Sequence, residues 1–265
     1  MKVKINDKEI YYDGWLHNEF SLIRDQIIKK DWDWVTFIDG IEGCGKSTLA
    51  QQLALLCDST FNIDNICFTA KEFIARVKAA NKYQAIVFDE AYGAIASTQT
   101  VNAICKTIAD LLSQIRQKNL FVFIVAPTFF DITRNIAIWR SKSLIHVYLG
   151  QNYQRGFWRA YTTSKKKNLY ILGKKLYNYN AVSPSARGRF TKQYTVDEEA
   201  YRKKKLDAFE SIDNTTEASP KPVQQRNTLI KFLHNKLEYD TRFITNLLDS
   251  ADTPLGIRQI QNIVK

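Results

Sequence analysis

Apolar residues follow two alternating patterns in the first 150 positions. Short, nearly continuous apolar runs alternate with longer segments in which apolar residues recur at every third or fourth position. The runs predict strands at 35–40, 65–70, 85–90, 120–127 and 143–150, and the segments between them predict amphipathic helices. Because several of these strands are apolar throughout, they suit a parallel sheet with helices on both faces. We therefore expect an α/β fold with a mostly parallel five-stranded sheet.

The pattern differs outside this region. Residues 1–34 form an N-terminal preface in which positions 21–30 have helical spacing. After Gly150, the run GFWRAYT, the polar turn SKKKN and the run LYILG predict a basic β-hairpin, and DEEAYRKKKLDAFE predicts a charged helix. The Thr-, Ser- and Pro-rich stretch NTTEASPKP predicts a linker. We expect a core at 35–150, an extension at 151–213, a linker at 214–222 and a small helical unit at 223–265.

Composition excludes several classes of protein. Hydrophobic residues make up 45% of the 265 residues, which is enough for a packed core. No apolar run approaches the roughly 18–20 residues that span a bilayer, and the first residues contain no apolar signal-peptide core. The four cysteines lack C-x-x-C spacing, so zinc and disulfide frameworks are disfavoured. We expect a cytoplasmic protein that does not associate with a membrane.

Positive charge is concentrated in one segment. The chain carries a net charge of +11, and residues 151–206 alone carry +11, whereas the segments on either side are close to neutral. The same segment contains ten aromatic residues. A block of this kind indicates a polyanionic partner, because an even distribution of charge would indicate only solubility.

The stretch GIEGCGKST matches the pattern G-x-x-x-x-G-K-[ST]. Glycines allow backbone N–H groups to surround phosphate oxygens, and the helix that follows presents its positive end to the same anion. Lys46 would contact the β- and γ-phosphates and the Ser47 hydroxyl would ligate Mg²⁺. The predicted nucleotide-binding residues are Gly40, Ile41, Glu42, Gly43, Cys44, Gly45, Lys46, Ser47 and Thr48.

The apolar run AIVFDE supplies two carboxylates for the same site. Asp89 ends a predicted strand and is placed to hold Mg²⁺ beside the P-loop. Glu90 follows directly, and a carboxylate in this position can polarise an attacking water molecule. The chain contains no N-K-x-D motif for reading guanine, which favours ATP over GTP.

These residues carry a family resemblance. Gly40–Ser47 resembles a Walker A motif, and Ala85–Glu90 resembles a Walker B motif with a catalytic Glu. One predicted strand lies between them, an order similar to that of the additional-strand, catalytic-Glu division of P-loop ATPases. That division includes AAA+ proteins, RecA-like motors, septal DNA translocases and viral packaging ATPases. The resemblance implies ATP hydrolysis with Mg²⁺ in a homo-oligomeric ring, such as a hexamer.

A looser resemblance covers the run IRQKNLFVFIVAPTFFDITRNIAIWR and the nearby DEA. It is similar to the zonula occludens toxin-like ATPases of phages and mobile elements. Those filamentous-phage proteins usually carry a membrane-spanning segment, and this sequence contains no run of that length. The resemblance therefore implies a soluble phage-type motor, located in the host cytoplasm if a phage encodes it.

Three more residues are candidates within this division. Thr128 is similar in position to a sensor of the γ-phosphate, although it also fits an ordinary turn that ends a strand. Arg134 and Arg140 are placed like arginine fingers that act on the site of a neighbouring subunit, and surface arginines are the alternative. The predicted catalytic set is Glu90, Lys46, Thr128, Arg134 and Arg140.

DNA is the expected polyanion. Basic side chains bind phosphates without reading sequence, and aromatic side chains can stack on unpaired bases, although the aromatic residues of a hairpin are as readily core. The C-terminal unit has a helix-turn-helix-like pattern, and a module that docks another protein fits that pattern as well. The predicted nucleic-acid contacts are Lys165, Lys166, Lys167, Lys174, Lys175, Arg187 and Arg189.

The leading hypothesis is an ATP-driven, ring-forming motor that translocates or packages viral or mobile-element DNA. A replication helicase or initiator-loader is the alternative within the same class. An ATP-gated nucleic-acid-binding assembly switch is the alternative from another class. A small-molecule kinase is disfavoured, because the Glu after Asp89 suits water activation and the basic segment exceeds what a phosphoryl acceptor needs.

Overall fold

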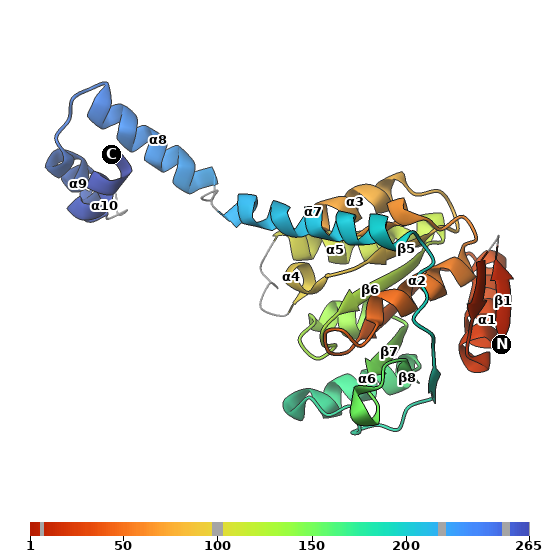
Figure 1. Cartoon of the computed structure of the whole chain (residues 1–265). Helices are drawn as coiled ribbons and strands as arrows, with labels where there is room; N and C mark the ends of the chain where they lie inside the picture. Colours follow the sequence, from red (N-terminus) through yellow and green to blue (C-terminus); the bar gives the residue numbers. More distant parts are fainter. Residues whose placement is uncertain (6–7, 97–102, 217–220, 251–254, 265) are drawn as a thin grey trace. The chain divides into compact units, whose positions relative to one another are not determined.

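The computed structural model describes residues 1–5, 8–96, 103–216, 221–250 and 255–264. The chain divides into two units, Met1–Ala208 and Phe209–Lys265 (Figure 1). Helix α7 (Glu198–Thr216) contains the boundary between them. The predicted nucleotide-binding residues all belong to the first unit.

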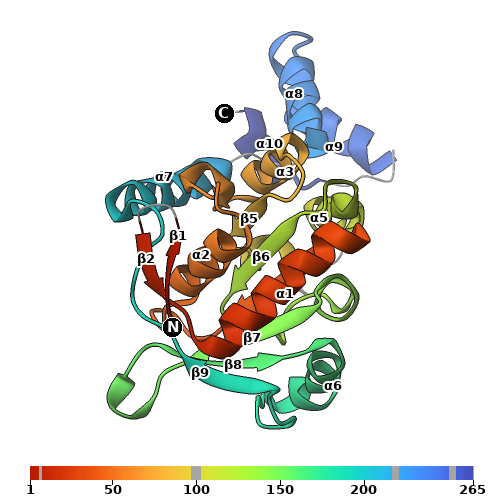
Figure 2. The same cartoon turned by 90° about the vertical axis from the view of Figure 1, so that its right-hand side faces the viewer.

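A seven-stranded sheet organises the first unit (Figure 2). The first five strands of the sheet are parallel, and the last two are antiparallel to their neighbours. In spatial order the strands are β4 (Ile66–Cys67), β5 (Ala85–Phe88), β6 (Phe121–Ala126), β3 (Trp34–Asp39), β7 (Ser143–Tyr148), β8 (Phe157–Tyr161) and β9 (Ala186–Arg189). This confirms the predicted α/β class with a mostly parallel sheet, and β6 is inserted between the strands that precede the two motifs.

Helices cover both faces of the sheet. Along β3, Val35 and Phe37 point to one face and Ile38 to the other, and all three are buried, which explains the continuous apolar run. Helices α1 (Gly14–Lys30) and α2 (Lys46–Cys57) pack on the Ile38 face. The Phe37 face is covered by α3 (Ala70–Ala79), α5 (Ala103–Gln114), η4 (Asn135–Arg140, a π-helix) and α6 (Thr163–Gly173).

Shorter elements complete the first unit. The preface adds an antiparallel pair, β1 (Lys2–Ile5) and β2 (Lys8–Tyr11), ahead of α1. The remaining single turns are η1 (Ile63–Asn65), α4 (Tyr92–Ile95), η3 (Ile115–Lys118), η5 (Gln151–Tyr153) and η6 (Lys174–Leu176).

The expectation of a hairpin with a turn at SKKKN was wrong. Residues 163–173 form α6, and the strand that follows β8 and pairs with it is β9, which lies outside the expected hairpin. Lys166, Leu169, Tyr170 and Gly173 are buried together, and their spacing of three and four residues is that of one helix face. The basic residues around Lys166 obscured this pattern. Strands β8 and β9 extend the predicted five-stranded sheet to seven strands.

Three helices form most of the second unit, as predicted. They are α8 (Lys221–Asn235), α9 (Thr241–Ser250) and α10 (Ile257–Val264), and Ile230, Ile244 and Ile260 form their buried core. The stretch expected to be a linker is helical at 214–216 and 221–222, and positions 217–220 lie outside the described residues. In the described part of the chain, every helix is too short or too polar to cross a bilayer.

Lys166 is fully buried. Its Nζ donates to the carbonyl oxygens of Ala137 and Ile138 and to Ser141 Oγ, so it caps the end of η4. Burial lowers the pKa of Lys166 to about 7. A buried ammonium cannot contact nucleic acid, so the expectation that Lys166 does so was wrong.

We predict that Lys166 makes stability depend on pH. Above about pH 7 the unfolded chain keeps a proton that the folded chain loses, so the free energy of unfolding should rise with pH up to about 10. Relative to Lys166→Met, the wild-type chain should gain up to about 1.4 kcal/mol per pH unit in that window. Denaturant unfolding of both chains at several pH values measures this. Lys167→Met, an exposed change on the same helix, should show no such slope, and a flat difference for Lys166→Met would contradict the prediction.

Candidate functional site

A loop between β3 and α2 forms the centre of the site. Gly40, Gly43 and Gly45 have φ values of 139°, 74° and 103°, a region that favours glycine. A Cβ at Gly40 would lie 2.0 Å from the carbonyl oxygen of Val147, and one at Gly45 would lie 3.0 Å from Cζ of Phe190. The three glycines therefore shape a cradle that side chains would fill, and the first turn of α2 follows directly.

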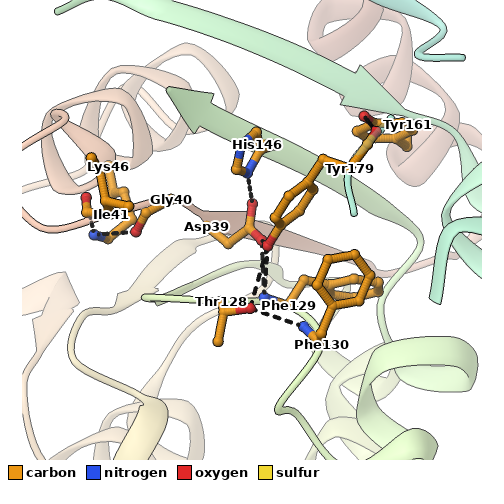
Figure 3. Close-up of polar contacts among 10 residues, drawn as sticks. All are labelled: Asp39, Gly40, Ile41, Lys46, Thr128, Phe129, Phe130, His146, Tyr161 and Tyr179. Atoms are coloured by element: carbon orange, nitrogen blue, oxygen red, sulfur yellow. Dashed lines mark hydrogen bonds and ion pairs between the residues drawn. The ribbon is translucent and has the colours of Figure 1, made fainter. Parts of the chain in front are cut away.

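The Lys46 side chain folds back onto the first residues of this loop. Its Nζ donates to the carbonyl oxygens of Gly40 at 2.7 Å and Ile41 at 2.8 Å (Figure 3). Both acceptors are neutral carbonyl groups, so an incoming phosphate would offer the ammonium a stronger, charged partner. The side chain is thus positioned to transfer from the loop to a bound anion.

Asp89 lies at the end of β5, one strand beyond β6. Its carboxylate is buried, and Oδ1 accepts from Ser47 Oγ at 3.1 Å while Oδ2 accepts from the Tyr201 hydroxyl at 2.6 Å. Burial raises the pKa of Asp89, and the hydrogen bonds from Tyr201 and Ser47 oppose that rise. The pair of Ser47 and Asp89 offers oxygen ligands of the kind that Mg²⁺ prefers.

Glu90 adopts a left-handed backbone conformation, with φ of 59°. Its side chain forms an ion pair with Lys205, whose Nζ lies 2.7 Å from Oε1. Tyr201 and Lys205 are both on α7 and are one helical turn apart, so α7 contacts both carboxylates of the site. Neither residue belongs to a motif that would have assigned it to the site from the sequence.

A cavity of about 400 Å³ joins these groups. This volume is within the range of small-molecule sites. Five cationic side chains line it against three carboxylates, which favours an anionic ligand. The cations are Lys46, Arg155, Lys192, Arg202 and Lys205, and the carboxylates are Glu42, Asp89 and Glu90.

The segment from Arg155 to Lys205 closes one side of the cavity. Phe190 packs against Gly45, and a Cβ at Gly43 would lie 3.6 Å from Nη2 of Arg155. Gln52 of α2 donates to the carbonyl oxygens of Thr191 and Gln193, which holds residues 191–193 against the middle of α2. The concentration of positive charge at 151–206 indicated that this segment contacts an anion, but it did not predict that some of its residues line the nucleotide site.

Three predicted catalytic residues lie elsewhere. Of the described residues that line the cavity, none is Thr128, Arg134 or Arg140. Thr128 Oγ1 lies 3.4 Å from the Tyr179 hydroxyl and accepts from the Phe130 N–H. Arg134 is exposed directly before η4, and Arg140 ends η4 with its Nε buried. Action on a neighbouring subunit stays a prediction for both arginines.

The remaining predicted nucleic-acid contacts divide between two places. Lys165 donates to the carbonyl oxygen of Pro184, Lys174 donates to the Tyr170 hydroxyl, and Lys167 lies 4.9 Å above the Trp139 ring, so each has an intramolecular partner. Lys175 is exposed on η6. The two arginines, Arg187 and Arg189, are exposed on β9.

A second buried carboxylate lies immediately before the loop. Asp39 ends β3 and accepts from His146 Nδ1 at 3.0 Å, from the Phe129 N–H at 2.9 Å and from the Tyr179 hydroxyl (Figure 3). These donors come from β7, from the chain after β6 and from the segment after α6. Through Asp39, the start of the P-loop is therefore hydrogen-bonded to three segments that are distant in the sequence.

Comparison with known proteins finds only distant structural likeness. No family model matches the chain, and no curated protein matches it. The N-terminal domain of zonular occludens toxin from Neisseria meningitidis is 14% identical, with a TM-score of 0.41, over 64% of this chain and 98% of that one. The genome packaging NTPase of Sulfolobus turreted icosahedral virus 2, in complex with ATP-gammaS, is 13% identical, with a TM-score of 0.35, over 52% and 95%. Strand order and the glycine-rich loop themselves define a P-loop NTPase fold.

We predict that the hydrogen bond from the Tyr201 hydroxyl favours the ionised form of the Asp89 carboxylate. Removing this hydrogen bond in Tyr201→Phe should raise the pKa of Asp89 further, so that ionisation of the carboxylate requires a higher pH. The pH at which affinity for the Mg²⁺ complex of a non-hydrolysable ATP analogue falls to half should therefore rise. Calorimetric titration across pH measures this shift. Tyr239→Phe, in the second unit, serves as the control, and an unchanged profile in Tyr201→Phe would refute the prediction.

Proposed function

We propose that this chain is an ATP-hydrolysing enzyme that acts on DNA as part of a homo-oligomer. The main support is that the glycine cradle, Lys46, the Ser47–Asp89 pair and Glu90 line one cavity with an excess of cations. Each group suits a separate part of an ATP molecule and its hydrolysis. A chance match to the P-loop pattern would not be expected to bring them together.

The chain's own groups divide the chemistry among them. Backbone N–H groups of the loop and the Lys46 ammonium would hold the phosphates, and Ser47 and Asp89 would hold Mg²⁺. Bound Mg²⁺ would neutralise charge on the phosphate oxygens. Glu90 would orient the attacking water and accept its proton, and for this its carboxylate must exchange Lys205 for that water.

Charge supports DNA as the partner. Of the basic residues in 151–206, Lys166 is buried, Lys204 pairs with Glu72 and Lys205 pairs with Glu90, yet most of the others remain at the surface. An unbalanced basic surface attracts a polyanion through its phosphates. Assembly into a ring, with Arg134 or Arg140 reaching a neighbouring site, completes the proposal of a translocating or packaging motor.

An ATP-gated assembly switch is a second candidate. It is favoured by the engagement of both Asp89 and Glu90 by α7, which would keep hydrolysis slow until α7 moves. Such a switch would hydrolyse ATP at the same slow rate with and without DNA. The two candidates thus differ in the response of hydrolysis to DNA.

We predict that ATP hydrolysis rises on adding DNA. Steady-state rates of the full chain should be measured with no DNA, with single-stranded DNA and with duplex DNA. Lys46→Ala should abolish hydrolysis by weakening phosphate binding, and Glu90→Gln should lower kcat by about 100-fold or more while ATP still binds. A slow rate that neither DNA form changes would eliminate the motor and leave the switch.

We predict that Lys205→Met raises kcat without DNA. The Lys205–Glu90 pair is half exposed, and such pairs contribute about 0.2–1 kcal/mol, so releasing Glu90 should raise kcat by up to about fivefold. The change should be measured at saturating ATP, because loss of a cation from the cavity also raises KM. Lys203→Met, on the same helix but absent from the cavity lining, is the matched control. A kcat as low as that of Glu90→Gln would show instead that Lys205 takes part in the reaction.

A further inference from the structure

Six side chains form two rows across β7, β8 and β9. Antiparallel register places His146 opposite Arg159 and Arg159 opposite Arg187. The second row follows from the pairing of Tyr148 with Phe157 and of Phe157 with Arg189. Residues directly opposite each other in a sheet share a face, and alternate residues along a strand share it too. One face of these three strands therefore carries three rings and three guanidinium groups.

The rings and guanidinium groups of these rows stack on one another. The ring centroids of His146 and Tyr148 are 6.2 Å apart, and the two ring planes make an angle of 9°. The ring centroids of Tyr148 and Phe157 are 5.8 Å apart, with an interplanar angle of 29°. The guanidinium carbon of Arg159 lies 4.6 Å from the Tyr148 ring centre, and that of Arg189 lies 4.7 Å from the Phe157 ring centre. Flat groups thus already lie against one another across this face.

These rows are accessible and positively charged. Tyr148 and Phe157 are half-buried, whereas Arg187 and Arg189 are exposed. None of the six side chains is a carboxylate. The nearest acid in the first row is Asp39, opposite His146, and it is fully buried with its oxygens already hydrogen-bonded. Among the residues that the structure describes, no ion pair involves Arg159, Arg187 or Arg189, so the exposed part of the face combines flat apolar surface with unpaired positive charge.

The same rows reach the nucleotide site through Asp39. His146 Nδ1 donates to the Asp39 carboxylate, and the Tyr179 hydroxyl donates to the same carboxylate (Figure 3). The rings of His146 and Tyr179 stack with their centroids 3.7 Å apart. Asp39 directly precedes Gly40 of the P-loop. A ligand that moved His146 would act on a residue one position from the phosphate cradle.

We propose that the face formed by His146, Tyr148, Phe157, Arg159, Arg187 and Arg189 binds single-stranded nucleic acid. This rests on the proposed function and assigns it a surface and a class of substrate. Unpaired bases stack on aromatic rings and on guanidinium planes, and the arginines bind backbone phosphates. Paired bases in a duplex keep their faces stacked on each other, so a flat row of rings offers a duplex only phosphate contacts.

The test is fluorescence anisotropy of the full chain with a labelled deoxyuridine oligonucleotide, a uridine oligonucleotide and a DNA duplex of the same length. We expect both single strands to bind more tightly than the duplex, and their ratio shows whether the sugar matters. Phe157→Leu should weaken single-strand binding by at least about fivefold. Arg187→Gln and Arg189→Gln should each reduce the slope of log affinity against log salt by about 0.7. Lys29→Gln, which removes an exposed charge on α1, should change none of these values.

Melting curves by circular dichroism accompany each variant. Because Phe157 packs against the backbone at Gly150, a loss of folding in Phe157→Leu would move the test to Tyr148→Leu and the two arginine variants. Equal affinity for the duplex, or folded ring and arginine variants that bind single strands as the wild type does, would overturn the assignment. If duplex DNA still stimulates hydrolysis in that case, the proposed function survives. If no nucleic acid binds, both fall.

Discussion

The parallel pairing of β6 with both β3 and β5 is the constraint on which the site depends. It brings the carboxyl ends of three strands to one edge, so the P-loop after β3 and Asp89 after β5 lie close enough for Ser47 to donate to Asp89. All six residues of β6 are buried, and the apolar area removed from water there stabilises the arrangement. Without β6 between them, the two motifs would not be held in a fixed relation.

Helix α7 adds a second constraint to the same edge. Tyr201 and Lys205 contact Asp89 and Glu90. Lys204 of the same helix donates to the carbonyl oxygens of Ile63 and Ile66, and Ile66 lies on β4, the strand next to β5. The helix then continues across the boundary into the second unit. One continuous helix therefore holds the residues that contact both carboxylates and the first residues of the second unit.

Asp39 connects the start of the P-loop with the stacked rows on β7, β8 and β9. Asp39 is fixed by donors from three separate segments, and one of them, His146, is also part of the stacked rows on β7, β8 and β9. The P-loop is thus linked to α7 by the hydrogen bonds of Asp89 with Ser47 and Tyr201. It is linked to the stacked rows by the hydrogen bond between Asp39 and His146.

Residue patterns were enough to predict the α/β class, the five parallel strands, the P-loop and the two carboxylates, because these depend on local periodicity and on residue types at fixed spacing. They did not reveal that Lys166 is buried, that residues 163–173 are helical, or that Tyr201 and Lys205 reach the site. Those facts depend on which distant segments pack together. The spacing of 201 and 205 shows only that they share a helix face, and the two rows on β7, β8 and β9 exist only through strand register. Register and packing are set by the burial of the whole sheet, so the tertiary structure alone decided them.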